Sequence, residues 1–167
     1  FIPKFPYYGS VDSTPLFLIT LSEYVRCTDD LALARELEDH IARAIDWIDL
    51  YGDTDGDGFV EYERMVPEGL LNQGWKDSED SIRFRDGSVA RGAIALVEVQ
   101  GYTFDAKRRT AEIYERLGDP GRADRLRIQA AQLRDRVAAA FRLLDRGYFA
   151  EALAGEKYSQ ASHNQRR

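Results

Sequence analysis

Apolar residues recur at intervals of three and four along most of the chain, which predicts amphipathic helices. Alternation of the kind found in β-strands is nearly absent. We expect four long helices: from a hydroxyl cap at Ser13 or Thr14 to about Arg26, from a cap at 28–30 to Gly52, from near Ala93 to Leu117, and from Asp119-Pro120 to Gly147. The pattern predicts an all-α protein built of helical hairpins.

One connection is much longer than a helical hairpin needs. Helix–helix connections usually take about 2–8 residues, and loops beyond about 12–15 residues in a compact domain are usually functional or disordered. The stretch 52–92 exceeds that range, contains a predicted turn at Asp86-Gly87, and is rich in aromatic and aliphatic residues. Because such a composition disfavours disorder, we expect the functional residues in this stretch.

Length and charge narrow the function classes. The chain has 167 residues, which fits one domain. Its net charge of −6 argues against a nucleic-acid surface, and no apolar run reaches the ~20 residues needed to span a bilayer. Only one cysteine (Cys27) and two histidines are present, so an internal disulfide and a histidine-rich metal centre are excluded. We expect a cytoplasmic protein without nucleic-acid or membrane partners.

The most unusual stretch is LLNQGWKDSEDS, at 70–81. Amides and carboxylates that bind hydroxyl groups, next to an indole that can stack on a sugar ring, are typical of carbohydrate-binding sites. The alternative is a polar loop capped by its own Asp and Ser side chains. The polar and aromatic candidates are Asn72, Gln73, Trp75, Lys76, Asp77, Glu79 and Asp80.

A second motif, DTDGDGFVE at 53–61, resembles the first nine positions of an EF-hand calcium loop. Asp53, Asp55 and Asp57 would supply oxygen ligands to Ca²⁺. Position 12 of the pattern should be a bidentate glutamate, but it is Arg64 here. An acidic turn whose Asp side chains bond their own backbone is the alternative. No cofactor other than this calcium ion is expected.

Two polar residues stand in the apolar first turns of the third predicted helix. Glu98 and Gln100 lie within AIALVEVQGY, and a buried carboxylate is costly unless it is paired or used. A core ion pair explains Glu98 as well as a role in a site does.

Four motifs together resemble a known family. YYGSVDSTPLF (7–17), DTDGDGFVEY (53–62), LNQGWKDSEDS (71–81) and ALVEVQGY (95–102) occur in this order, as in the catalytic region of the six-hairpin glycosidases. The bacterial glycogen-debranching, amylo-α-1,6-glucosidase type is the most similar, and trehalases and processing α-glucosidases are more distant. The resemblance implies an (α/α)6 toroid, an oligo- or polysaccharide substrate (an α-glucan), and inverting hydrolysis by two carboxyl groups.

The resemblance also implies roles for individual residues. Asp77 would be the general acid, and Trp75 and Tyr8 would be sugar platforms. Asp12 would bind substrate hydroxyl groups, and Glu98 and Gln100 would line the sugar pocket. Asn72, Gln73 and Lys76 complete the predicted substrate-binding set.

The chain also departs from the family. Twelve helices make a toroid and only four long ones are predicted, so we expect one incomplete domain over 1–167, with the catalytic base outside the chain. Residues 156–167 match the family poorly: His163 lacks the expected preceding glycine. Apolar faces meant for further hairpins would then promote self-association. A non-catalytic helical scaffold that binds proteins, with or without a calcium loop, is the alternative function.

Overall fold

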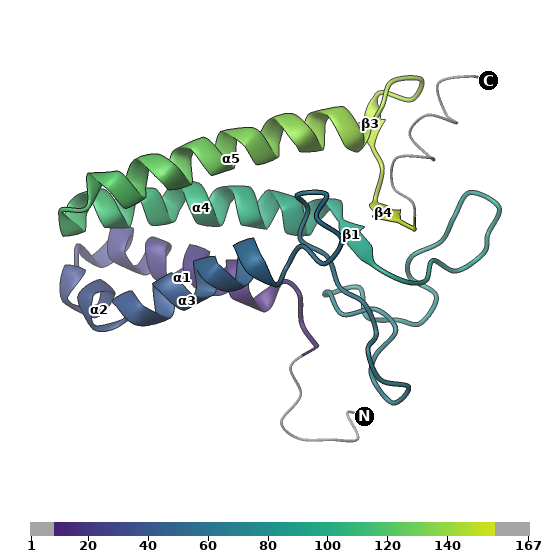
Figure 1. Cartoon of the computed structure of the whole chain (residues 1–167), viewed down its shortest axis with the longest axis horizontal. Helices are drawn as coiled ribbons and strands as arrows, with labels where there is room; N and C mark the ends of the chain where they lie inside the picture. Colours follow the sequence, from purple (N-terminus) through teal and green to yellow (C-terminus); the bar gives the residue numbers. More distant parts are fainter. Residues whose placement is uncertain (1–8, 156–167) are drawn as a thin grey trace.

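In the computed structural model, which describes residues 9–155, α4 is the central helix (Figure 1). It packs against α5 on one side and against α1 and α3 on the other. The elements are α1 (Ser13–Thr28), α2 (Leu31–Glu36), α3 (Glu38–Leu50), β1 (Ile94–Leu96), α4 (Val97–Leu117), α5 (Pro120–Ala140), β2 (Arg142–Leu143), β3 (Tyr148–Phe149) and β4 (Ala152–Ala154).

The α4–α5 hairpin is the one that the sequence predicts. Gly118 ends α4 with a φ of 89°, in the left-handed region that glycine tolerates best. Asp119 then caps α5 by accepting a hydrogen bond of 2.9 Å from the Arg122 backbone N–H, and Pro120 takes the first helical position. The predicted turn is therefore confirmed.

The second predicted helix is two helices. Asp30 caps α2 as expected, because its Oδ1 accepts hydrogen bonds from the backbone N–H groups of Ala32 and Leu33. At Leu37 the backbone leaves the helical region, with φ −94° and ψ 9°, and α3 begins at Glu38. The apolar spacing continues through this break, so the hydrophobic pattern alone does not reveal it.

Short strands replace two predicted helical segments. Residues 94–96 form β1, which pairs antiparallel with β4, so α4 begins at Val97 and not at Ala93. The last helix ends at Ala140 and not near Gly147, because β2 and β3 form a hairpin in which Gly147 adopts a φ of 71°. The chain is mostly helical, as predicted, and two small sheets lie where α4 begins and where α5 ends.

The main core lies around α4. Val99, Ala106 and Ile113 of α4 pack with the buried apolar residues of α1 and α3. A smaller core forms where the loop after α3 meets the end of α5: the rings of Phe59 and Phe141 lie edge to face, with centroids 5.2 Å apart. Among the described residues, no helix has the length and apolar character needed to cross a membrane.

Candidate functional site

The loop at 70–81 lies beside β1 and is fixed by buried hydrogen bonds. Asn72 is fully buried: its Oδ1 accepts a hydrogen bond of 2.8 Å from the Tyr62 hydroxyl, and its Nδ2 donates one of 2.6 Å to the Ser78 carbonyl oxygen. Gly74 allows the close approach to β1, because a Cβ there would lie 2.6 Å from Leu96 Cδ1. This irregular segment therefore has a defined shape.

The start of the chain also holds this loop. The backbone N–H of Val11 donates a 2.8 Å hydrogen bond to the Gln73 carbonyl oxygen. The Gln73 amide makes only long contacts, of 3.4 Å, with the carbonyl oxygens of Glu63 and Leu70. Among the predicted amides, Gln73 is thus the one most easily released to a ligand.

Lys76 links the loop to α4 and to the segment before β4. Its Nζ donates a 2.6 Å hydrogen bond to Glu151 Oε1 and lies 3.4 Å from Glu98 Oε1. Burial lowers the pKa of Lys76, but the Glu151 hydrogen bond and the charges of Glu98 and Glu151 outweigh burial and raise the pKa above its ordinary value. Lys76 therefore stays charged and forms ion pairs with the carboxylates of both Glu98 and Glu151.

Glu98 occupies a confined position in the first turn of α4. Its Oε1 is buried and makes no hydrogen bond of good geometry with any described residue, although the Lys76 ammonium is near. The charge of Glu98 and burial together raise the pKa of Tyr62, burial being the larger cause. Glu98 thus has an ion-pair partner, at a partly buried position, and its role in a sugar pocket stays a prediction.

The predicted sugar platform, Trp75, and the predicted general acid, Asp77, are both exposed. Trp75 is 65% exposed, and the Lys76 ammonium lies 5.4 Å from the centroid of its ring. Asp77 is exposed, and no described residue forms a hydrogen bond or an ion pair with its carboxylate. The loop thus presents an aromatic plate and a carboxyl group two positions apart.

Two further predicted substrate ligands lie inside the protein. Gln100 is fully buried: it accepts from the Val60 N–H (2.9 Å) and donates to the carbonyl oxygens of Val60 (2.6 Å) and Leu96 (3.0 Å). Its amide joins the acidic loop to α4, so a sugar would reach it only after these bonds break. A direct sugar-binding role for Gln100 stays a prediction.

Asp12 precedes α1 and is also buried. Its Oδ1 accepts a 2.7 Å hydrogen bond from the Ser10 hydroxyl. The helix begins at Ser13, so the expected cap by Ser13 or Thr14 is wrong; Asp12 takes the cap position without a side-chain capping bond. Tyr8, the second predicted sugar platform, lies outside the described residues.

The acidic loop collects carboxylates, with one change from the expected set. One ligand oxygen from each of Asp53, Asp55 and Glu61 lies within 4.8 Å of the others. Asp57 is not in this group; its Oδ1 accepts a 2.9 Å hydrogen bond from the Phe59 N–H. Hard oxygen ligands suit Ca²⁺, so Asp53, Asp55 and Glu61 are the residues that could hold it.

The loop already uses part of its acceptor capacity. Both oxygens of Asp53 accept backbone hydrogen bonds, from Gly56 (2.7 Å) and Gly58 (2.8 Å), and Glu61 accepts from Thr54. These are the self-capping bonds that the alternative interpretation expects. Glu61 is the acid at the ninth position of the calcium-loop pattern, and this position could have indicated it as the third possible ligand beside Asp53 and Asp55.

Among the described residues, Glu151 is a member of the site that the sequence did not indicate. It lies 75 positions after Lys76, and the pairing of β4 with β1 places it near the start of α4. Its carbonyl oxygen also accepts a 3.0 Å hydrogen bond from the Val97 N–H at the start of α4.

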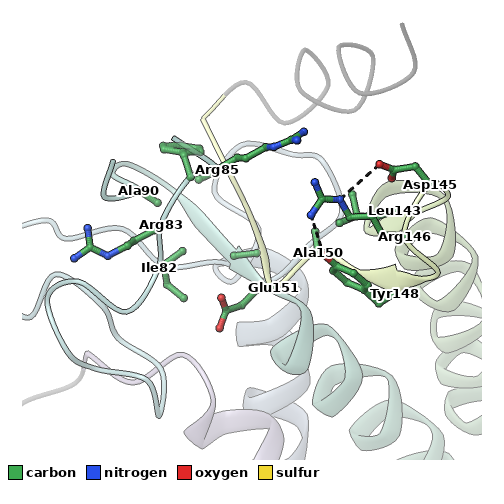
Figure 2. A pocket seen from close by; sticks show the side chains of 13 residues that line it. Ile82, Arg83, Arg85, Ala90, Leu143, Asp145, Arg146, Tyr148, Ala150 and Glu151 are labelled. Atoms are coloured by element: carbon green, nitrogen blue, oxygen red, sulfur yellow. Dashed lines mark hydrogen bonds and ion pairs between the residues drawn. The ribbon is translucent and has the colours of Figure 1, made fainter. Parts of the chain in front are cut away.

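Figure 2 shows Glu151 at the edge of a cavity of about 350 Å³, with Arg146 beside Asp145 and Tyr148.

Comparison with known proteins does not show a family for this chain. No family model matches the chain, and no curated protein matches it.

Proposed function

We propose that this chain is the part of an α-glucosidase of the glycogen-debranching type that supplies the general acid, Asp77, and a sugar platform, Trp75. The observation that carries the proposal is that some side chains of the loop at 70–81 fix its shape while others are exposed to solvent. Asn72 and Lys76 are held by contacts that fix the loop, whereas Trp75 and Asp77 are exposed. The order of the four motifs, which resembles the six-hairpin glycosidases, supports the same function.

In the proposed mechanism, a glucosyl ring stacks on the indole of Trp75. The carboxylic acid of Asp77 protonates the oxygen of the leaving group. A second carboxylate, about 6.5–9.5 Å away on the opposite face of the ring, activates the attacking water and gives inversion. That base comes from outside these residues, within an (α/α)6 toroid that further hairpins complete.

The ion-paired group at Lys76 positions this acid. Lys76 directly precedes Asp77, and its bond to Glu151 and contact with Glu98 restrict the backbone from which Asp77 projects. A catalytic acid must be held in a productive geometry, and a displacement of about 1 Å costs on the order of 10²-fold in rate. The proposed role of Lys76, Glu98 and Glu151 is therefore to position Asp77.

Activity measured on the complete open reading frame tests the proposal. Asp77→Asn keeps the shape and removes the acid, so it should lower kcat by about 10²–10⁴-fold on α-1,6-linked glucans. Glu79→Gln is the matched control, because Glu79 is an exposed neighbour in the same loop that has no partner among the described residues. Full activity of the Asp77→Asn enzyme would overturn the assignment.

Binding tests the platform separately. Glucose, or an iminosugar mimic of the oxocarbenium-like transition state, should perturb the NMR signals of Trp75 and Asp77. Perturbation confined to 120–145 would instead support the non-catalytic scaffold.

A further inference from the structure

A second polar cavity lies away from the loop at 70–81. Its volume is about 230 Å³, and it is open to solvent and lined by residues of α3, α4, α5 and the acidic loop. We propose that this cavity binds a neutral polyhydroxy ligand the size of one sugar ring. Its polar lining includes Asp49, Asp53, Thr103, Lys107, Gln129 and Arg136.

A rigid hydrogen-bonded group forms one wall. Lys107 is 6% exposed. Its ammonium group donates hydrogen bonds to Asp49 Oδ1 and, at 3.2 Å, to Gln129 Oε1. Gln129 Nε2 donates to Asp49 Oδ2 at 2.9 Å. The three side chains come from three helices and hold one another in place, so a ligand meets groups that are already ordered.

Thr103 contributes a hydroxyl group whose hydrogen-bonding capacity no described residue takes up. It is 1% exposed, and its Oγ1 has no hydrogen-bond partner among the described residues. A buried hydroxyl group without a partner costs free energy. Because a helical threonine populates two χ1 rotamers, rotation can turn this hydroxyl group toward a ligand in the cavity.

Charge balance favours a neutral ligand. Asp49 and Asp53 offset Lys107 and Arg136, so the lining attracts neither an anion nor a cation strongly. Carboxylates accept hydrogen bonds, guanidinium and ammonium groups donate them, and amides do both, which suits hydroxyl groups.

Size points to the same ligand class. Pockets for drug-sized ligands measure roughly 300–1,000 Å³. A cavity of about 230 Å³ matches a single hexose better than a longer oligosaccharide.

This site does not depend on the proposed function. Its lining includes no residue of 70–81, so binding here requires neither Asp77 nor Trp75. A chain that lacks glycosidase activity could still bind a hexose in this cavity.

NMR titration of the 167-residue protein with D-glucose, taken into the millimolar range, tests the inference. We expect saturable shifts of the backbone amides of Gly58, Thr103 and Lys107 and of the side-chain amide of Gln129. Thr103→Val, which removes the hydroxyl group and keeps the shape, should weaken this binding about three- to tenfold.

Thr110→Val is the matched control. Thr110 is also a buried residue of α4 whose hydroxyl group has no partner among the described residues, but it does not line the cavity. The inference fails if both variants bind glucose alike, if glucose causes no saturable shift, or if inorganic phosphate alone gives the response. Loss of the glucose-induced shifts of Thr103 and Gln129 in Asp77→Asn would show that they report a ligand bound at the loop, and would also overturn the inference.

Discussion

Lys76 Nζ lies 2.6 Å from Oε1 of Glu151, a residue 75 positions later in the chain. This bond joins the candidate catalytic loop to the segment that leads into β4. The same ammonium group contacts Glu98 at the start of α4. Three segments distant in sequence thus meet at one cation, next to the proposed acid.

Removing the Glu151 carboxylate should weaken this junction. We expect Glu151→Gln to lower the free energy of unfolding by about 0.5–1 kcal/mol, the upper range for partly exposed ion pairs. Urea denaturation measures the change. Glu79→Gln, in the exposed part of the loop, should alter stability by less, and an equal loss in both variants would contradict the role given to Glu151.

The same junction should show a pH dependence. Because the folded-state pKa of Lys76 is raised above 10.5, its stabilisation is complete below that value and is lost as the pH rises through the folded-state pKa. The stability difference between the parent protein and Lys76→Met should therefore shrink above about pH 10.5. A difference that stays constant from pH 8 to about 11.5 would contradict this origin.

Gln100 should be important for stability whatever it does for a substrate. Gln100→Leu leaves the Val60 N–H and C=O buried without their side-chain partner. Each such group costs about 1–3 kcal/mol, so we expect a loss of roughly 2–4 kcal/mol in chemical denaturation. Gln132→Leu, at an exposed position of α5, should change stability little. A Gln100→Leu protein as stable as the parent would show that these hydrogen bonds are not needed for stability.

Calcium should stabilise the folded protein if the acidic loop binds it. Binding only to the folded state raises the melting temperature, by an amount set by concentration and affinity. The rise should disappear in Asp53→Asn and persist in Asp39→Asn, an exposed carboxylate on α3. Equal melting temperatures in millimolar calcium and in chelator would support the alternative, an acidic turn whose side chains bond only their own backbone.

The isolated chain should self-associate and lack measurable α-glucosidase activity. It offers one proposed catalytic carboxyl group, and the β2–β3 hairpin exposes Leu144, Tyr148 and Phe149. Exposed apolar patches favour association. Leu144→Asp should lower the mass measured by light scattering, whereas Ile128→Asp on α5 serves as the control. A monomer at all concentrations, or turnover by this chain, would contradict these expectations.

The sequence alone predicted the elements whose causes are local. The apolar spacing indicated the helical class, and Gly118, Asp119 and Pro120 indicated the turn between α4 and α5, because capping involves residues within one turn of helix. The Asp86-Gly87 turn was predicted in the same way, and Gly87 adopts a φ of 86° there. The motif at 70–81 also indicated candidate site residues, whose roles stay predictions.

Only the tertiary structure decided what depends on distant partners. Residues 94–96 form a strand because β4 lies beside them, and no local pattern distinguishes three buried apolar residues there from a helical turn. The side-chain amides of Gln100 and Asn72 are buried in hydrogen bonds because the Val60 backbone and the Tyr62 hydroxyl group reach them. Glu151 joins Lys76 for the same reason: a contact across 75 residues is set by how the chain packs, which spacing along the sequence does not encode.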